Sequence, residues 1–444
     1  MKKNVYIFGL GYVGYPLMLI LANKRSHNKN LFNVTGIEVS KKKIDNLYSF
    51  KQKGNLPFDT TDRKLIRLAR TKVSRNIKIY EESEIDKIDG TILICINFDG
   101  LQKLNQLKNF FKKISSKMKK SSLLIIESTL IPGTCEKILY PIIKKELKKR
   151  KIGMKNFSFG YSYERIMPGN DYVNSIINNF KSISGIDEQS KKKISSFYKL
   201  FLNYKKFPIT EFNKISECEA AKIMENSYRA LNISFIDEWN KFSLINKLNL
   251  KKIINSIKIR KTHSNIMRPG IGVGGYCLTK DPKFAEISSK EIFKTKSYFP
   301  LSKMSVSINN QMPNFCFEYI KKKIKGLKKK KILIIGTAYK SDVSDTRYSP
   351  SISLIKIFKK KGYKITNIDP LVNLKEYLEI YPNKIKYFDL VIFSVPHKYL
   401  QKININIFKK QTIIFDLDYV LNEKQINKFQ KNKIKVYSLG DFSD

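Results

Sequence analysis

The chain has 444 residues, of which 42% are hydrophobic, and a formal net charge of +47 at pH 7. This length predicts two or three domains, and the apolar content excludes a disordered chain. The charge favours an anionic partner, namely nucleic acid, an acidic membrane surface or a nucleotide. However, the lysines are spread over the whole chain in runs such as 144–151 and 321–331. We interpret these runs as solvated helix faces and expect no specific nucleic-acid site.

The five cysteines are scattered and show no CxxC spacing. This pattern argues against a disulfide scaffold or a structural zinc site and predicts a reducing, cytoplasmic environment. Three isolated histidines suggest no metal site either. The apolar stretch 5–22 resembles a membrane anchor. Its regularly spaced glycines favour a strand, a turn and a helix instead, so we expect no membrane association.

The first forty residues carry the pattern of a dinucleotide-binding turn. A short apolar run predicts a buried strand, which is followed by glycines at 9, 11 and 14 and then by a helical apolar stretch. Glycine permits a tight turn and close approach to a pyrophosphate, which the helix N-terminus would stabilise. Glu38 ends a second predicted strand (33–38), where a carboxylate accepts ribose hydroxyls and repels a 2′-phosphate, so NAD is favoured over NADP. The residues expected to contact the cofactor here are Gly9, Gly11, Tyr12, Val13, Gly14 and Glu38.

Further strands predicted at 91–96 and 122–129 alternate with helices, as in a doubly wound parallel sheet. Ligands bind at the carboxyl ends of such strands, where Thr129 would place its hydroxyl. A later strand runs into a loop that carries Glu164 and Arg165.

A long helix is predicted over 216–242, since the segment has neither proline nor glycine. Lys222, Asn226 and Arg229 share one face of it. On its own, this spacing favours a solvated basic helix face. A binding site is the alternative, because the helix lies in the chain between Glu164 and the glycine-rich stretch 270–282.

The stretch 270–282 sets four glycines ahead of Cys277 and then follows the thiol with Lys280 and Asp281. Because glycine lets backbone approach a ligand closely, we interpret the loop as a pocket wall around a thiol.

The last third predicts a second, shorter α/β unit, with buried strands within 330–340, 361–370, 389–397 and 411–420. It lacks a GxGxxG motif, so a second dinucleotide is not expected.

Taken together, the motifs resemble those of the UDP-glucose/GDP-mannose dehydrogenase family, the NAD-dependent nucleotide-sugar 6-dehydrogenases. The matching segments, in the order of the family, are GLGYVGYP, ESTLIPGT, YSYERIMPG, EAAKIMENSYRALNISFIDE, PGIGVGGYCLTKDP and GTAYKSDVSDTRYSP. The resemblance implies an α/β chain with two Rossmann-like doubly wound domains joined by a helical central domain. The expected divisions are an NAD-binding domain at 1–205, a helical and dimerising domain at 206–325, and a UDP-sugar domain at 326–444.

The resemblance also implies catalytic roles. Cys277 would add to an aldehyde intermediate, since a thiohemiacetal can lose the second hydride that an aldehyde alone cannot. Lys222 and Asn226 would stabilise the oxyanion. Asp281 would take the alcohol proton, directly or through water, and Glu164 would act on the water that cleaves the thioester.

Other residues would bind water, cofactor or substrate. By resemblance, Thr129 holds the hydrolytic water and contributes to the cofactor site, and Arg347 reaches the cofactor. The substrate, a nucleotide sugar with UDP as the expected nucleotide, would contact Glu164, Arg165, Lys222, Asn226, Arg229, Arg260, Gly274 and Lys340. Arg260 is a candidate contributed by a second subunit, and a homodimer or higher homo-oligomer is expected.

The resemblance implies oxidation of the sugar C6 alcohol to a uronic acid for surface polysaccharide, and leaves the sugar open between hexoses and N-acetylhexosamines. Two alternatives compete with this interpretation. A single-hydride hydroxyacid or 6-phosphogluconate-type dehydrogenase would need no thiol, and a basic nucleic-acid-binding or membrane-surface protein would show no turnover.

Overall fold

The computed structural model describes residues 2–58, 60–153 and 157–441. The chain forms two compact units, one made of residues 1–225 and 284–298 and the other of residues 226–283 and 299–444. The predicted division into three domains remains a prediction.

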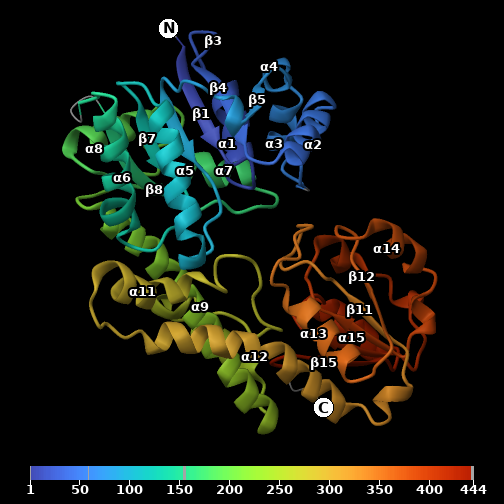
Figure 1. The fold of residues 1–444 in the computed structure, drawn as a ribbon. Helices are drawn as coiled ribbons and strands as arrows, with labels where there is room; N and C mark the ends of the chain where they lie inside the picture. Colours follow the sequence, from blue (N-terminus) through green and yellow to red (C-terminus); the bar gives the residue numbers. More distant parts are fainter. Residues whose placement is uncertain (1, 59, 154–156, 442–444) are drawn as a thin grey trace. The chain divides into compact units, whose positions relative to one another are not determined.

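The first unit is built around an eight-stranded sheet with the order β10-β9-β8-β7-β6-β1-β4-β5 (Figure 1). Neighbouring strands run parallel except for β8 and β9, which pair antiparallel. Its strands are β1 (Lys3–Phe8), β4 (Phe32–Glu38), β5 (Lys78–Glu81), β6 (Thr91–Ile94), β7 (Leu123–Ile126), β8 (Ser158–Tyr163), β9 (Ser182–Gly185) and β10 (Thr210–Phe212), with a small hairpin of β2 (Arg25–Ser26) and β3 (Lys29–Asn30).

Helices cover both faces of this sheet. Successive side chains of a strand point to opposite sides of the sheet, and each side has its own apolar cluster. Both faces of the sheet are therefore buried. One cluster includes residues of α1 and α8, and the other includes residues of α5 and α6. The helices are α1 (Gly14–Asn23), α2 (Lys41–Gln52), α3 (Arg63–Ala69), α4 (Lys72–Arg75), α5 (Leu104–Lys117), α6 (Tyr140–Lys149), α7 (Tyr172–Ile177), α8 (Glu188–Lys199) and α11 (Phe284–Ile287).

The second unit holds a five-stranded parallel sheet with the order β12-β11-β13-β14-β15 (Figure 1). Its strands are β11 (Ile332–Ile335), β12 (Ile365–Ile368), β13 (Leu390–Phe393), β14 (Ile413–Asp416) and β15 (Lys435–Ser438). Its helices are α10 (Leu250–Lys258), α12 (Pro300–Lys323), α13 (Pro350–Lys360), α14 (Leu374–Ile380) and α15 (Glu423–Lys431). Both sheets are thus of the doubly wound type, as the sequence predicts.

The helix α9 (Ile215–Ile245) supplies residues to both units, with the boundary after Glu225. It carries Lys222 in the first unit and Asn226 and Arg229 in the second. The apolar stretch that resembles a membrane anchor forms β1 and α1. In the described part of the chain, no helix has both the length and the apolar character needed to cross a bilayer.

Candidate active site

The glycine-rich loop links β1 to α1, as the sequence predicts. A Cβ at Gly14 would lie 2.1 Å from the Gly9 carbonyl oxygen, so only glycine permits this packing of helix against strand. A Cβ at Gly11 would meet no atom within 4 Å, which leaves open space beside the loop. Open space at the N-terminus of α1 suits a pyrophosphate, because the first N–H groups of a helix have no intrahelical partner.

Glu38 lies at the carboxyl end of β4, beside this loop. Its carboxylate accepts hydrogen bonds from the backbone N–H of Leu10 at 3.1 Å and of Val39 at 3.0 Å, and pairs with Lys43. Each carboxylate oxygen has more than one acceptor position, so ribose hydroxyls can still donate to it. The residues present therefore fit a dinucleotide with unphosphorylated ribose.

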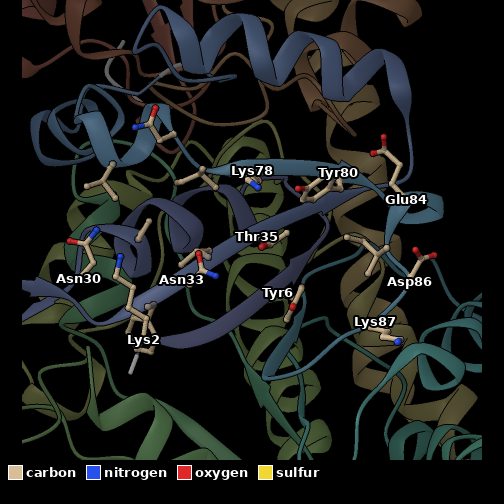
Figure 2. Close-up of a pocket in the computed structure, with 17 residues that line it drawn as sticks. Lys2, Tyr6, Asn30, Asn33, Thr35, Lys78, Tyr80, Glu84, Asp86 and Lys87 are labelled. Atoms are coloured by element: carbon tan, nitrogen blue, oxygen red, sulfur yellow. The ribbon is translucent and has the colours of Figure 1, made fainter.

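A cavity of about 640 Å³ in the first unit lies elsewhere (Figure 2). It runs along β1, β4 and β5, where Lys2, Tyr6, Thr35 and Lys78 line it. None of the residues predicted to bind the cofactor lines it. The cavity is therefore separate from the predicted cofactor site.

A buried ionic cluster occupies the carboxyl edge of the first sheet. Lys181 Nζ lies 2.7 Å from Glu127 Oε2 and 2.5 Å from Glu164 Oε2. The hydroxyl of Tyr198 donates to Glu127. Burial raises the pKa of Glu127 to about 6, although Lys181 acts in the opposite direction. Burial acts to lower the pKa of Lys181, but the two carboxylates together raise it above its ordinary value.

Other predicted residues of the first unit adjoin this cluster. Lys222 Nζ donates to the backbone oxygen of Glu164 at 2.9 Å. Arg165 pairs with Glu225 at 2.8 Å. Thr129 is half-buried just beyond β7. The structure thus places the Lys222 ammonium against the backbone of Glu164, and the catalytic roles predicted for the two residues stay predictions.

The cysteine loop belongs to the second unit, where Cys277 opens a tight turn. The backbone N–H of Asp281 donates to the Cys277 carbonyl at 2.9 Å. The Asp281 side chain is wholly buried and holds Asn226 Nδ2 and Lys280 Nζ, each at 2.7 Å. With both carboxylate oxygens engaged, Asp281 is well placed to orient Asn226 and Lys280 beside the turn. Its predicted role in proton transfer stays a prediction.

The loop glycines have a packing reason that the sequence did not suggest. A Cβ at Gly275 would lie 2.6 Å from the Tyr339 ring, and one at Gly274 would lie 2.5 Å from the Tyr348 carbonyl oxygen. Protein atoms, rather than open space, therefore face these two positions within the second unit. The predicted contact of Gly274 with substrate would therefore have to come from the side of its backbone that faces away from these protein atoms.

Two cations predicted to contact the substrate, Arg229 and Lys340, lie near each other in the second unit. Burial lowers the pKa of Lys340, and the Arg229 guanidinium lowers it further, against an opposite effect of Asp342. Cations that repel each other in this way are relieved by an anion, as a pyrophosphate would provide. Arg347 forms a fork with Asp345, with its Nη2 2.6 Å from Oδ2, and Arg260 is exposed after α10.

Several polar residues near these sites escaped the sequence analysis. Besides Lys181 and Glu127, the structure shows wholly buried His397 with Nε2 3.2 Å from Asp369 Oδ2. Asp369 also accepts the N–H groups of Thr337 and Ala338, in the loop that leads to Lys340. A lone histidine gives no sequence signal of such pairing. Lysine is so common in this chain that Lys181 gives none either.

The two doubly wound sheets, the glycine-rich loop and its acidic partner define a dinucleotide-binding protein of the doubly wound α/β class. Family models extend this result across the chain. The NAD binding domain of the UDP-glucose/GDP-mannose dehydrogenase family matches residues 3–202, its central domain matches 216–311, and its UDP binding domain matches 333–423. The chain belongs to this family, and its substrate is accordingly a nucleotide sugar.

Individual relatives agree with this assignment. The chain is 30% identical to a UDP-N-acetyl-D-mannosamine dehydrogenase of Methanocaldococcus jannaschii, over 99% of this chain and 97% of the relative. It is 28% identical to a UDP-N-acetyl-D-glucosamine 6-dehydrogenase of Salmonella typhi, over 96% and 98% of the two chains. The fold is similar to that of a UDP-D-ManNAc dehydrogenase from Pyrococcus horikoshii, with a TM-score of 0.79 at 22% identity over 99% of each chain.

Proposed function

We propose that this chain oxidises the C6 alcohol of a UDP-N-acetylhexosamine to the uronic acid, in a four-electron reaction that uses two NAD. The names of the relatives from Methanocaldococcus jannaschii and Salmonella typhi support the N-acetylhexosamine. We further propose that the enzyme is cytoplasmic, acts as a homodimer and supplies surface polysaccharide synthesis.

The observation that carries the mechanism is the exposure of one thiol. All five cysteines fall within the described residues: Cys277 is exposed, Cys95 is half-buried with a pKa raised by burial, and the other three, Cys135, Cys218 and Cys316, are buried. Burial raises the pKa of each of these three buried thiols, which makes them poor nucleophiles. An accessible thiol next to a fixed polar turn suits nucleophilic catalysis.

NAD, when bound, accepts a hydride from the carbon that is oxidised. In the proposed sequence, the alcohol first becomes an aldehyde, and Cys277 sulfur then adds to the aldehyde carbon to form a thiohemiacetal. Loss of a second hydride gives a thioester on Cys277, which water hydrolyses to the acid. Lys222 and Asn226 would stabilise the oxyanion, and Asp281 would hold Asn226 in place.

The test is Cys277→Ser, with Cys316→Ala as a control in the same unit. UDP-N-acetyl-D-mannosamine and UDP-N-acetyl-D-glucosamine are incubated with NAD, and NADH and uronic acid are quantified. We expect two NADH per sugar for the native enzyme and a loss of acid formation of at least about 10³-fold for Cys277→Ser.

Acid formation at the native rate by Cys277→Ser would refute the thiol mechanism. One NADH per substrate would instead favour a single-hydride dehydrogenase. Absence of turnover together with tight, salt-dependent nucleic-acid binding would favour a basic nucleic-acid-binding protein.

A further inference from the structure

Lys181 lies at the edge of the first sheet where the parallel strands end, because the neighbouring strand β9 runs antiparallel to β8. Tyr163, the last residue of β8, lies opposite Ser182, the first residue of β9. Glu164 and Lys181 are the next residues outward on the two strands, and so they face each other. Parallel strands deliver their carboxyl ends to this edge, whereas the reversed β9 delivers its amino end.

This geometry fixes both oxygens of the Glu164 carboxylate. Oε1 accepts the backbone N–H of Arg165 at 2.7 Å, and Oε2 accepts Lys181 Nζ at 2.5 Å. Lys181 is itself anchored by Glu127, which Tyr198 holds from the other side. The side chains of Lys181 and Glu127 are 7% and 0% exposed, so water screens their interaction little.

The cluster also carries a net charge. With both glutamates ionised, the two carboxylates and one ammonium have a formal charge of −1, which the variants described below change in a defined way. Other ionisable groups near the cluster are Cys95, Tyr163, Arg165, Tyr198, Lys222 and Glu225.

We propose that Lys181, anchored by Glu127 and Tyr198, is a positioning residue that fixes the Glu164 carboxylate for hydrolysis of the Cys277 thioester. This inference rests on the proposed function and extends it to Lys181 and Tyr198, which lie outside the family motifs quoted for this chain. In the step concerned, a water oxygen bonds to the thioester carbonyl carbon and one water proton passes to Glu164. The carbon–sulfur bond breaks, sulfur leaves as thiolate and the sugar acid is released.

The experiment compares variants that separate position from charge. Lys181→Met removes the clamp and changes the cluster charge to −2, whereas Glu127→Gln/Lys181→Met removes the clamp but restores −1. Lys181→Arg keeps a cationic donor. Lys191→Met is the control, because Lys191 is a part-buried lysine of the same unit that pairs with Glu188 on α8.

Each enzyme is mixed with NAD and UDP-N-acetyl-D-mannosamine, and with UDP-N-acetyl-D-glucosamine in a parallel series. The first-turnover burst of NADH is recorded, and the acyl adduct on Cys277 is followed by intact-protein mass spectrometry over a range of pH. We expect Lys181→Met and the double variant to keep the burst, to accumulate the adduct and to hydrolyse it about 100-fold more slowly. Lys181→Arg should recover most of the rate, and Lys191→Met should match the native enzyme.

Native hydrolysis by the folded double variant would overturn the proposal, because Lys181 would then only balance charge. Native hydrolysis by Lys181→Met would overturn it as well. If Lys181→Met does not fold, the double variant and Lys181→Arg decide the question. Absence of a burst and of an adduct in the native enzyme would instead mean that the proposed function has failed.

Discussion

At the scale of single residues, Glu38 is the carboxylate predicted to select NAD over NADP. The carboxylate lies beside the glycine-rich loop, where it accepts the Leu10 N–H and pairs with Lys43. In Glu38→Gln the charge is lost while Lys43 remains. We expect kcat/KM for NAD to fall about 10–100-fold, as for loss of a charged hydrogen bond, and use of NADP to increase.

Steady-state kinetics with both cofactors checks this prediction. Lys41→Gln on the same helix as Lys43 is a control for surface charge, since Lys41 is exposed. An unchanged ratio of NAD to NADP use in Glu38→Gln would contradict the role of this carboxylate.

The sequence identified residues that belong to a motif of recognisable spacing. Glu38, Cys277 and Asp281 belong to this group, and the structure places Asp281 in the turn that begins at Cys277. It did not find Lys181, whose carboxylate partners are 54 and 17 residues away. Such a pairing depends on strand order and direction, which no local pattern contains.

At the scale of elements, α9 presents a row of exposed aromatic side chains. Tyr228, Phe235, Trp239 and Phe242 are all about half exposed or more, at spacings of seven, four and three residues. This spacing places them on one face of the helix, and the Trp239 ring contacts both Phe235 and Phe242. Side chains of this size and exposure mark an interaction surface.

We expect this face to form the proposed homodimer. Trp239→Glu would place a charge in the buried contact and should raise the dimer dissociation constant at least about 100-fold, by analogy with aromatic hot spots. Sedimentation velocity over a concentration series measures the constant. Ser196→Glu, at an exposed position of α8, adds the same charge elsewhere. A native chain that sediments as a monomer, or a Trp239→Glu variant that remains dimeric, would contradict the assignment.

Helical periodicity predicted this element well. The expected helix over 216–242 is found as Ile215–Ile245, because the segment lacks residues that break helices. The division of its residues between two compact units was not predictable. It follows from which long-range contacts each turn of the helix makes.

At the scale of the whole molecule, buried carboxyls should make stability depend on pH. Burial raises the pKa of both Glu219 and Asp237 to about 8. Between their ordinary pKa and these values, the folded state binds more protons than the unfolded state. Stability contributed by these groups therefore decreases as pH rises from about 4 to 8.

Asp237→Asn isolates this effect, since an amide has no charge to bury. We expect the variant to be more stable than the native chain at pH 8.5 by about 1–3 kcal/mol, and the difference to shrink towards pH 5. Thermal unfolding across this range measures the difference, with the exposed Asp45→Asn as the control. The net charge of +47 adds a general repulsion that grows as pH falls. This repulsion acts almost equally on the native chain and the variant, so it cancels in the difference between their stabilities. Equal stability at pH 8.5 would contradict the prediction.

The sequence by itself determined the two doubly wound sheets, the cofactor loop and the glycine-rich turn at Cys277. These features depend on hydrophobic periodicity and on glycine at fixed positions, both of which act over short distances along the chain. Only the tertiary structure decided that β9 runs antiparallel, that Lys181 joins Glu127 and Glu164, and that Tyr339 fills the space beside Gly275. These are contacts between segments that are distant in the sequence. They stabilise the fold only after the chain has packed and water has been excluded from them.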